Sequence, residues 1–218
     1  MDTILQALLF RLREGCSWRA LSIFAPHTTI YTRWRQWCEQ GIWERILKSL
    51  SSAAKGQLWS IDSTSSKVHK HAMGGPGDAE MQAIGRSRGG ANTKIHALVD
   101  TRGRALRLIL TAGQRNDILA APDLVADHTQ RTILADKAYD SDQFRLLLES
   151  LDLKACIPPT ANRSAPSAYH KGHYKRRHQV ENFFQRLKEK RALAMRFEKL
   201  ASRFLCLVTL AAICDWLR

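Results

Sequence analysis

Three carboxylates occupy positions in the sequence where their side chains could work together. Asp62 directly follows the short apolar run 58–61, and Asp136 follows the apolar run 131–135. Both runs are predicted strands, and catalytic groups collect at strand ends in α/β sheets. The third carboxylate, Glu181, lies in a basic segment that is predicted to be helical. Together these residues could bind Mg²⁺ or Mn²⁺, because both ions prefer hard oxygen ligands.

The chemistry open to such a site is phosphodiester cleavage. Two metal ions roughly 3.5 to 4 Å apart can bind the attacking and leaving oxygens of an in-line displacement. Converging carboxylates repel one another without a cation, so a preformed acidic cluster implies one. Each residue also has a simpler interpretation. Asp62 or Asp136 could cap a turn, and Glu181 could form an ordinary ion pair with Arg177, one helical turn away.

The basic segment that carries Glu181 is predicted to form a helix over residues 173–195. At about 100° per residue, Tyr174, Arg177 and Lys188 fall on the same face as Glu181. The adjoining face is apolar and could pack against a sheet. The helix would then direct one carboxylate towards the end of the sheet and present cations beside it.

The charge balance of the chain favours a polyanionic partner. The 218 residues include 34 Lys and Arg against 20 Asp and Glu, a formal net charge of +14. Residues 171–203 alone contain eleven Lys and Arg against three Glu. With 44% hydrophobic and 25% charged residues, the composition is that of a globular chain and excludes a wholly disordered basic tail. We therefore expect the charge to lie on a folded, nucleic-acid-binding protein.

Other classes of protein are disfavoured by the cysteines and the apolar segments. The five cysteines include no CxxC pair, so neither a zinc ribbon nor a disulfide framework is indicated, and a cytoplasmic location is expected. The apolar run 204–213 is about half the length of a membrane span and predicts a buried helix. No secretion signal is visible at the N-terminus.

The first fifty residues have the pattern of three short helices, at about 4–12, 18–24 and 30–40. Tight turns between them make a helix-turn-helix candidate, in which the third helix would lie in a major groove. That helix would offer DNA the side chains of Thr29, Thr32, Arg33 and Arg35. The alternative is a small helical bundle that packs on its neighbour and does not contact DNA.

The rest of the chain has a mixed α/β pattern. Two further strands, 94–99 and 105–110, are separated by a turn and predict a hairpin. A strand at 154–157 precedes the basic helix, and a last helix is predicted over 199–217. We therefore expect a helical segment at 1–50 and an α/β domain at 57–218.

The spacing of the basic helix resembles the C-terminal signature of bacterial insertion-sequence transposases of the DDE class. That signature is Tyr174-x2-Arg177-x3-Glu181-x6-Lys188. Further segments resemble the insertion sequence five family and occur in the order of that family. They are Ile61-Asp62-Ser63-Thr64, Arg88-Gly89-Gly90 followed by residues 93–100, residues 110–114, and Leu134-Ala135-Asp136-Lys137-Ala138-Tyr139-Asp140.

The resemblance implies a fold, a metal site and a DNA substrate. The fold would be an RNase H-like mixed sheet flanked by helices, preceded by the helix-turn-helix-like segment. Two Mg²⁺ or Mn²⁺ ions would be held by Asp62, Asp136 and Glu181. The enzyme would cut at terminal inverted repeats and join the 3′ hydroxyl to target DNA. Residues expected to contact or position DNA are Tyr174, Arg177, Lys188, Thr93 and Lys94.

The implied partners are double-stranded DNA, as element end and as target, and further copies of the same chain on paired ends. Related transposases usually carry some residues before the first helix found here, so a shortened N-terminus is expected. Two alternatives stay open. One is a DNA-binding remnant that occupies the inverted repeats without catalysis, and the other is a simple metal-dependent nuclease of the same fold.

Overall fold

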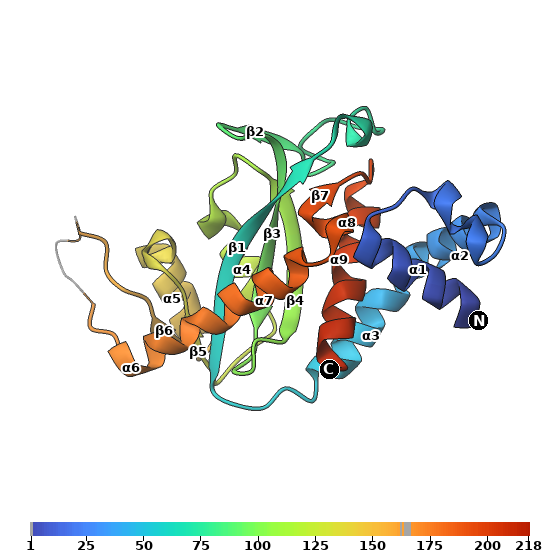
Figure 1. The fold of residues 1–218 in the computed structure, drawn as a ribbon. Helices are drawn as coiled ribbons and strands as arrows, with labels where there is room; N and C mark the ends of the chain where they lie inside the picture. Colours follow the sequence, from blue (N-terminus) through green and yellow to red (C-terminus); the bar gives the residue numbers. More distant parts are fainter. Residues whose placement is uncertain (1, 162, 164–166) are drawn as a thin grey trace.

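The computed structural model describes residues 2–161, 163 and 167–218. Among these residues, a seven-stranded mixed sheet forms the centre, and helices cover both of its faces (Figure 1). The strands are β1 (Leu58–Val68), β2 (Gly85–Ser87), β3 (Gly90–Val99), β4 (Ala105–Ala112), β5 (Thr132–Leu134), β6 (Lys154–Cys156) and β7 (Met195–Arg196).

The helices before the basic segment are α1 (Asp2–Glu14), α2 (His27–Glu39), α3 (Ile42–Ser51), α4 (Ala121–Val125) and α5 (Asp142–Ser150). Those that follow are α6 (Lys171–Tyr174), α7 (His178–Lys188), α8 (Arg191–Ala194) and α9 (Ala201–Trp216). Short 3₁₀ turns are η1 (Trp18–Ile23), η2 (Lys70–Ala72), η3 (Asp117–Ala120), η4 (Lys137–Tyr139) and η5 (Lys175–Arg177). In the described part of the chain, no helix has the length and apolar character that a membrane crossing needs.

The strand β1 is central in the sheet. It pairs antiparallel with β3 and parallel with β5, and β6 continues the sheet parallel to β5. The strands β2 and β4 both pair antiparallel with β3. The predicted hairpin is confirmed as β3 and β4, and its turn contains Gly103 at a positive φ of 73°.

The end of β1 differs from the prediction. We expected the strand to stop at Asp62, but it continues to Val68. The residues after Asp62 are mostly Ser and Thr, so the run lacks the apolar alternation that marks a half-buried strand. The extension is stabilised by pairing, because β3 lies along one side and β7 pairs with Lys67 and Val68. Asp62 therefore lies within a strand.

The two faces of the sheet pack against different helices. On one face Ile95 and Val99 of β3 share a core with Val180 and Phe183 of α7 and with α9. On the other face the core is formed by α4, α5 and the sheet residues that point the opposite way, such as Ile61. Alternate residues of a strand point to opposite faces, which is why one strand contributes to both cores.

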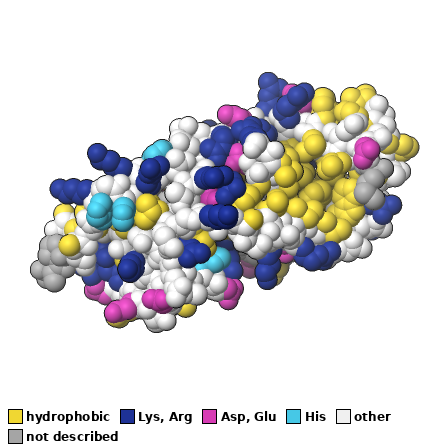
Figure 2. Space-filling model, turned by 90° about the horizontal axis from the view of Figure 1, so that it is seen from below, with side chains coloured by type: hydrophobic (Ala, Val, Ile, Leu, Met, Phe, Trp, Pro, Cys, Tyr) yellow, Lys and Arg dark blue, Asp and Glu magenta, His cyan; other side chains and the backbone are white. Residues whose placement is uncertain are grey.

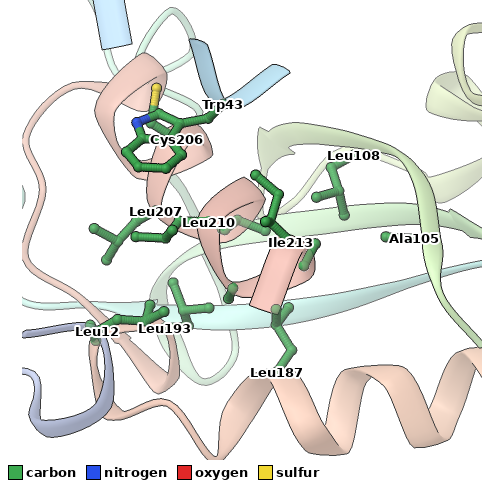
Figure 3. Packing of buried hydrophobic residues seen from close by; sticks show 14 of the residues in the cluster. Leu12, Trp43, Ala105, Leu108, Leu187, Leu193, Cys206, Leu207, Leu210 and Ile213 are labelled. Atoms are coloured by element: carbon green, nitrogen blue, oxygen red, sulfur yellow. The ribbon is translucent and has the colours of Figure 1, made fainter. Parts of the chain in front are cut away.

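The N-terminal helices share the first of these cores. Trp34 of α2 and Trp43 of α3 are buried with residues of α9 in one hydrophobic cluster, part of which Figure 3 shows around Trp43 and Leu207. The expected α/β class and the buried final helix are confirmed. The helix α3 was not predicted from the sequence. Its burial of Trp43 and Leu47 against α9 explains why it forms.

The basic segment also differs from the single helix expected over 173–195. It is divided into α6, η5, α7 and α8, and the chain then leaves the helical conformation at Met195 to form β7. Pairing of β7 with β1 competes with continuation of the helix. The Ser17 side chain accepts from the Ala20 amide and caps η1, and the Ser141 side chain caps α5 by accepting from the Phe144 amide.

Candidate active site

Two of the three predicted carboxylates belong to neighbouring parallel strands, Asp62 within β1 and Asp136 two residues after the end of β5. Ser60 of β1 is the register partner of Leu134 of β5. Asp62 and Asp136 each follow these partners by two residues, so the parallel register carries both to the same level of the sheet. Asp62 is half-buried, and one of its oxygens accepts a hydrogen bond from the Ser63 amide at 2.8 Å. The other oxygen, Oδ2, faces Arg177 at the end of η5.

The third carboxylate is connected to Asp62 through Arg177. The Arg177 Nη1 donates to Asp62 Oδ2 at 2.8 Å, and its Nη2 donates to Glu181 Oε1. Val180 and Phe183 are buried against the sheet, which fixes α7 with Arg177 and Glu181 beside β1. The structure therefore joins Asp62, Arg177 and Glu181, as the simpler ion-pair interpretation of Glu181 also expected.

The electrostatics of the site depend on burial. Burial raises the pKa of Asp62, and the charge of Asp136 adds to that rise, while the Ser63 amide and Arg177 act in the opposite direction. Burial acts to lower the pKa of Arg177, but the charges of Asp62 and Glu181 raise it above its ordinary value. The guanidinium therefore stays charged and offsets part of the cost of placing carboxylates together.

Three carboxylates are ligands of the kind that a hard divalent cation prefers, but Asp62, Asp136 and Glu181 are not gathered around one point. Asp136 Oδ1 accepts from the Ala138 amide at 2.9 Å as the cap of η4. Within the described ranges, no three His, Cys, Asp or Glu side chains form a group that could hold a metal ion. In this arrangement the cation beside Asp62 and Glu181 is Arg177 itself. The types of residue are therefore suitable for Mg²⁺ or Mn²⁺, and Arg177 forms ion pairs with two of the three carboxylates, Asp62 and Glu181.

Sequence reasoning missed Tyr139, which lies beside the same carboxylates. Its side chain is 1% exposed, and its hydroxyl has no hydrogen-bond partner among the residues that the structure describes. Burial raises the pKa of Tyr139, and the charges of Asp117, Asp62 and Asp136 raise it further. The segment Leu134 to Asp140 contained the signal, because Tyr139 follows Asp136 by three residues there.

The predicted DNA contacts on the basic segment are partly accessible. Lys188 is exposed, and it forms no ion pair with any residue that the structure describes. Tyr174 is half-buried and packs edge-on against Tyr169, with ring centroids 5.5 Å apart. Figure 2 shows Lys and Arg side chains spread over one part of the molecular face and an apolar area over another. The α7 side therefore combines cations with the carboxylate site.

Thr93 does not lie where DNA could contact it. We expected it to contact DNA directly before a strand at 94–99, but β3 begins at Gly90 and Thr93 is fully buried. Its hydroxyl donates to the Ala83 carbonyl at 2.6 Å and accepts from Arg196 Nη1 at 2.7 Å. Thr93 thus has a structural role. Lys94 is partly buried, and its Nζ donates to Asp117 Oδ1 at 2.7 Å and to the Arg115 carbonyl at 2.8 Å.

The residues expected to read a major groove lie on α2. Thr29, Thr32 and Arg33 are exposed, and Arg35 is exposed with Glu39 3.8 Å away. The inner side of α2 is held by Ile30 and Trp34, both fully buried. The accessible face of α2 therefore includes all four predicted side chains.

Comparison with known sequences places the chain in a protein class. Residues 54–214 match the family described as Transposase DDE domain, which covers well over half of the chain. The chain therefore belongs to the DDE transposase family, a class of DNA transposases. Residues 1–47 match the family described as Putative transposase of IS4/5 family, which confirms the resemblance to insertion-sequence transposases.

Two curated sequences are similar to the chain. A putative transposase for insertion sequence element IS6501 of Brucella ovis is 38% identical over 128 residues, 58% of this chain and 98% of that protein. The uncharacterized protein y4sN of Sinorhizobium fredii is 34% identical over 71 residues, 32% of this chain and 57% of that protein.

Among solved structures, the piggyBac transposase in a synaptic complex with hairpin DNA is similar in fold, with a TM-score of 0.52 and 13% sequence identity. The match covers 80% of this chain, which spans about half (49%) of the piggyBac chain. The expected RNase H-like fold, a mixed sheet flanked by helices, is confirmed.

Proposed function

We propose that this transposase cuts DNA at the terminal inverted repeats of its element and joins the 3′ hydroxyl to target DNA, with Asp62, Asp136 and Glu181 as metal ligands. The observation that supports the proposal most is the parallel register that brings Asp62 and Asp136 to one level beside the helix of Glu181. When bound, a pair of Mg²⁺ or Mn²⁺ ions would activate the attacking oxygen and stabilise the leaving one.

The protein's own residues would bind and position the DNA. Lys188, exposed on the helix of Glu181, would bind a backbone phosphate next to the carboxylates. Tyr174, at the other end of the basic segment, would contact the DNA end through its ring or hydroxyl. Lys188 and Glu181 belong to the same helix, α7, whose buried face fixes it against the sheet.

We further propose that residues 1–50 form a DNA-binding segment and residues 57–218 the catalytic domain. The exposed residues of α2, Thr29, Thr32 and Arg33 together with Arg35, would read the inverted repeat. A second copy of the chain would bind the paired end. The net charge of +14 supports DNA as the partner of both segments.

An Asp62→Asn variant tests the proposal. The protein is incubated with a labelled duplex that carries the end of its element, in Mg²⁺ or in a chelator. We expect metal-dependent nicks at the end and joined products for the natural chain, and no cleavage with unchanged DNA binding for Asp62→Asn. The absence of any metal-dependent nick in the natural chain would contradict the proposal. Loss of DNA binding in the variant would show that Asp62 is structural.

A second candidate is a DNA-binding protein without catalysis. It is favoured by one observation, that Arg177 ion-pairs with two of the proposed ligands and no metal-holding group is assembled among the described residues. In the same assay this candidate predicts binding of the end without nicks. A simple nuclease predicts nicks without joined products.

A further inference from the structure

Arg177 differs from the other cations of its segment in what it contacts. Its guanidinium is 17% exposed and bridges two carboxylates from different elements, Asp62 of β1 and Glu181 of α7. The preceding residues, Lys175 and Arg176, are exposed and form no ion pair with a described residue. The fork of an arginine can donate to two carboxylates at once, which a lysine cannot do with the same geometry.

The bridge uses the oxygens that a metal ion would need. A divalent cation at this site would be held by carboxylate oxygens of Asp62 and Glu181. Arg177 donates to Asp62 Oδ2 and Glu181 Oε1, and a guanidinium and a metal ion cannot occupy the same oxygens while repelling each other. Arg177 and a metal ion are therefore competitors for these side chains.

The backbone at Arg177 allows the side chain to be released. Arg177 is the last residue of the 3₁₀ turn η5, directly before α7 begins at His178. The hydrogen bonds of 3₁₀ turns have poorer geometry than those of α-helices, and such turns often mark hinges. The buried residues that fix α7, Val180 and Phe183, lie beyond this junction. The guanidinium can swing away while Glu181 keeps its place.

We propose that Arg177 is an internal counter-cation that holds Asp62 and Glu181 together until a divalent cation displaces it, and that the released guanidinium then binds a DNA phosphate. This inference rests on the proposed metal site. It makes the binding of metal and the binding of DNA mutually supportive, because each favours the state in which Arg177 has left the carboxylates. The charge of the bridge also keeps the site compact in the metal-free protein.

The first test titrates the full chain with Mn²⁺ by calorimetry in the absence of DNA. Removal of the competitor in Arg177→Gln should tighten Mn²⁺ binding by about tenfold or more, because the two carboxylates are no longer held in the bridged state that cannot bind the ion. The matched control Arg176→Gln removes the same charge from an exposed, unpaired neighbour and should change the affinity by less than about twofold. Arg177→Lys keeps the charge without the fork, and should also bind Mn²⁺ more tightly than the natural chain.

The outcomes distinguish the bridge from the metal site itself. If Arg177→Gln and the natural chain bind Mn²⁺ equally well and Asp62→Asn abolishes binding, the competition by Arg177 is refuted while the proposed metal site stands. Binding that survives Asp62→Asn in the Arg177→Gln background would overturn the metal site, as would no binding to either protein. If Arg177→Lys binds like the natural chain, net charge and not the fork explains the competition, and the bridge is refuted. Circular dichroism verifies that each variant is folded.

The second test asks whether the released guanidinium binds DNA, by measuring how the affinity for a 30-bp duplex of random sequence depends on salt concentration. Each neutralised phosphate makes the log–log salt slope more negative by about 0.9. The slopes of the natural chain and Arg177→Gln should differ by about this amount in Ca²⁺ and should coincide in a chelator, where Arg177 stays on the carboxylates. The same difference in both solutions would show that Arg177 contacts DNA without any release.

Discussion

Arg196 of β7 is fully buried and provides the sharpest test of what holds the fold together. Its guanidinium donates to the carbonyls of Gln82 and Glu198, each at 2.8 Å, and to that of Lys199 at 3.1 Å. It also donates to the Thr93 hydroxyl at 2.7 Å. Burial lowers the pKa of Arg196 to about 10, so the group is still charged at neutral pH. One side chain thus connects β3, the segment before β2 and the start of α9.

The cost of removing this guanidinium follows from the acceptors that it leaves behind. Arg196→Met keeps the aliphatic part of the side chain but leaves buried carbonyls and a hydroxyl without donors. Each buried acceptor left without its donor costs about 1 to 3 kcal/mol, and loss of the buried charge itself offsets part of the sum, so we expect a net loss of about 3 to 5 kcal/mol. For a chain of this length, each kcal/mol lost from the free energy of unfolding lowers the melting temperature by about 2 to 4 °C. The melting temperature should therefore fall by about 10 °C.

Urea unfolding and thermal melting measure this change, with Arg191→Met as the matched control. The Arg191 side chain is 75% exposed and lies 3.3 Å from Glu14, so its loss should cost less than about 0.5 kcal/mol. If Arg196→Met loses under about 1 kcal/mol, or no more than the control, the buried network does not stabilise the fold and the reasoning is refuted.

Two further predictions concern buried polar groups. Burial lowers the pKa of His96 from 6.5 to about 4, so between these values the unfolded chain binds a proton that the folded chain does not, and stability falls as the pH falls. The free energy of unfolding, measured with urea, should fall by about 2 kcal/mol between pH 7 and pH 5, and the His96→Gln variant should lose less over the same range. An equal loss in both proteins would rule out His96 as the cause. Tyr139→Phe removes a buried hydroxyl that has no partner in the described part of the chain, so in the same assay the free energy of unfolding should stay unchanged or rise by about 1 kcal/mol. A clear destabilisation would contradict this expectation.

Local sequence signals predicted much of the fold. The hairpin of β3 and β4, the buried helix α9 and the strands before Asp62 and Asp136 all have apolar patterns that extend over several residues. The far half of β1 was missed because its Ser and Thr residues show no apolar alternation and are held in the strand by pairing with β3. The helix α3 was missed because its formation depends on packing against α9.

In the candidate site, too, local patterns predicted some features, whereas contacts between distant parts of the chain could not be predicted. Asp62, Asp136 and Glu181 could be found from spacing and from their place after apolar runs. The bridge by Arg177 to Asp62 joins residues 115 positions apart, and no local pattern encodes that contact. Thr93 was misplaced for a related reason, since its burial depends on Arg196 reaching it from the other end of the chain.

The pairing of β7 with β1 limits the insertions and deletions that the protein can tolerate. The strand that carries Asp62 is held at one level by Arg177 and at another by Met195 opposite Lys67. The segment between these two anchors therefore has a set length. An inserted or deleted residue between Glu181 and Met195 would rotate the helix by about 100° or break the strand pairing. Sequence drift in this stretch should consist of substitutions, and insertions should accumulate elsewhere in the chain.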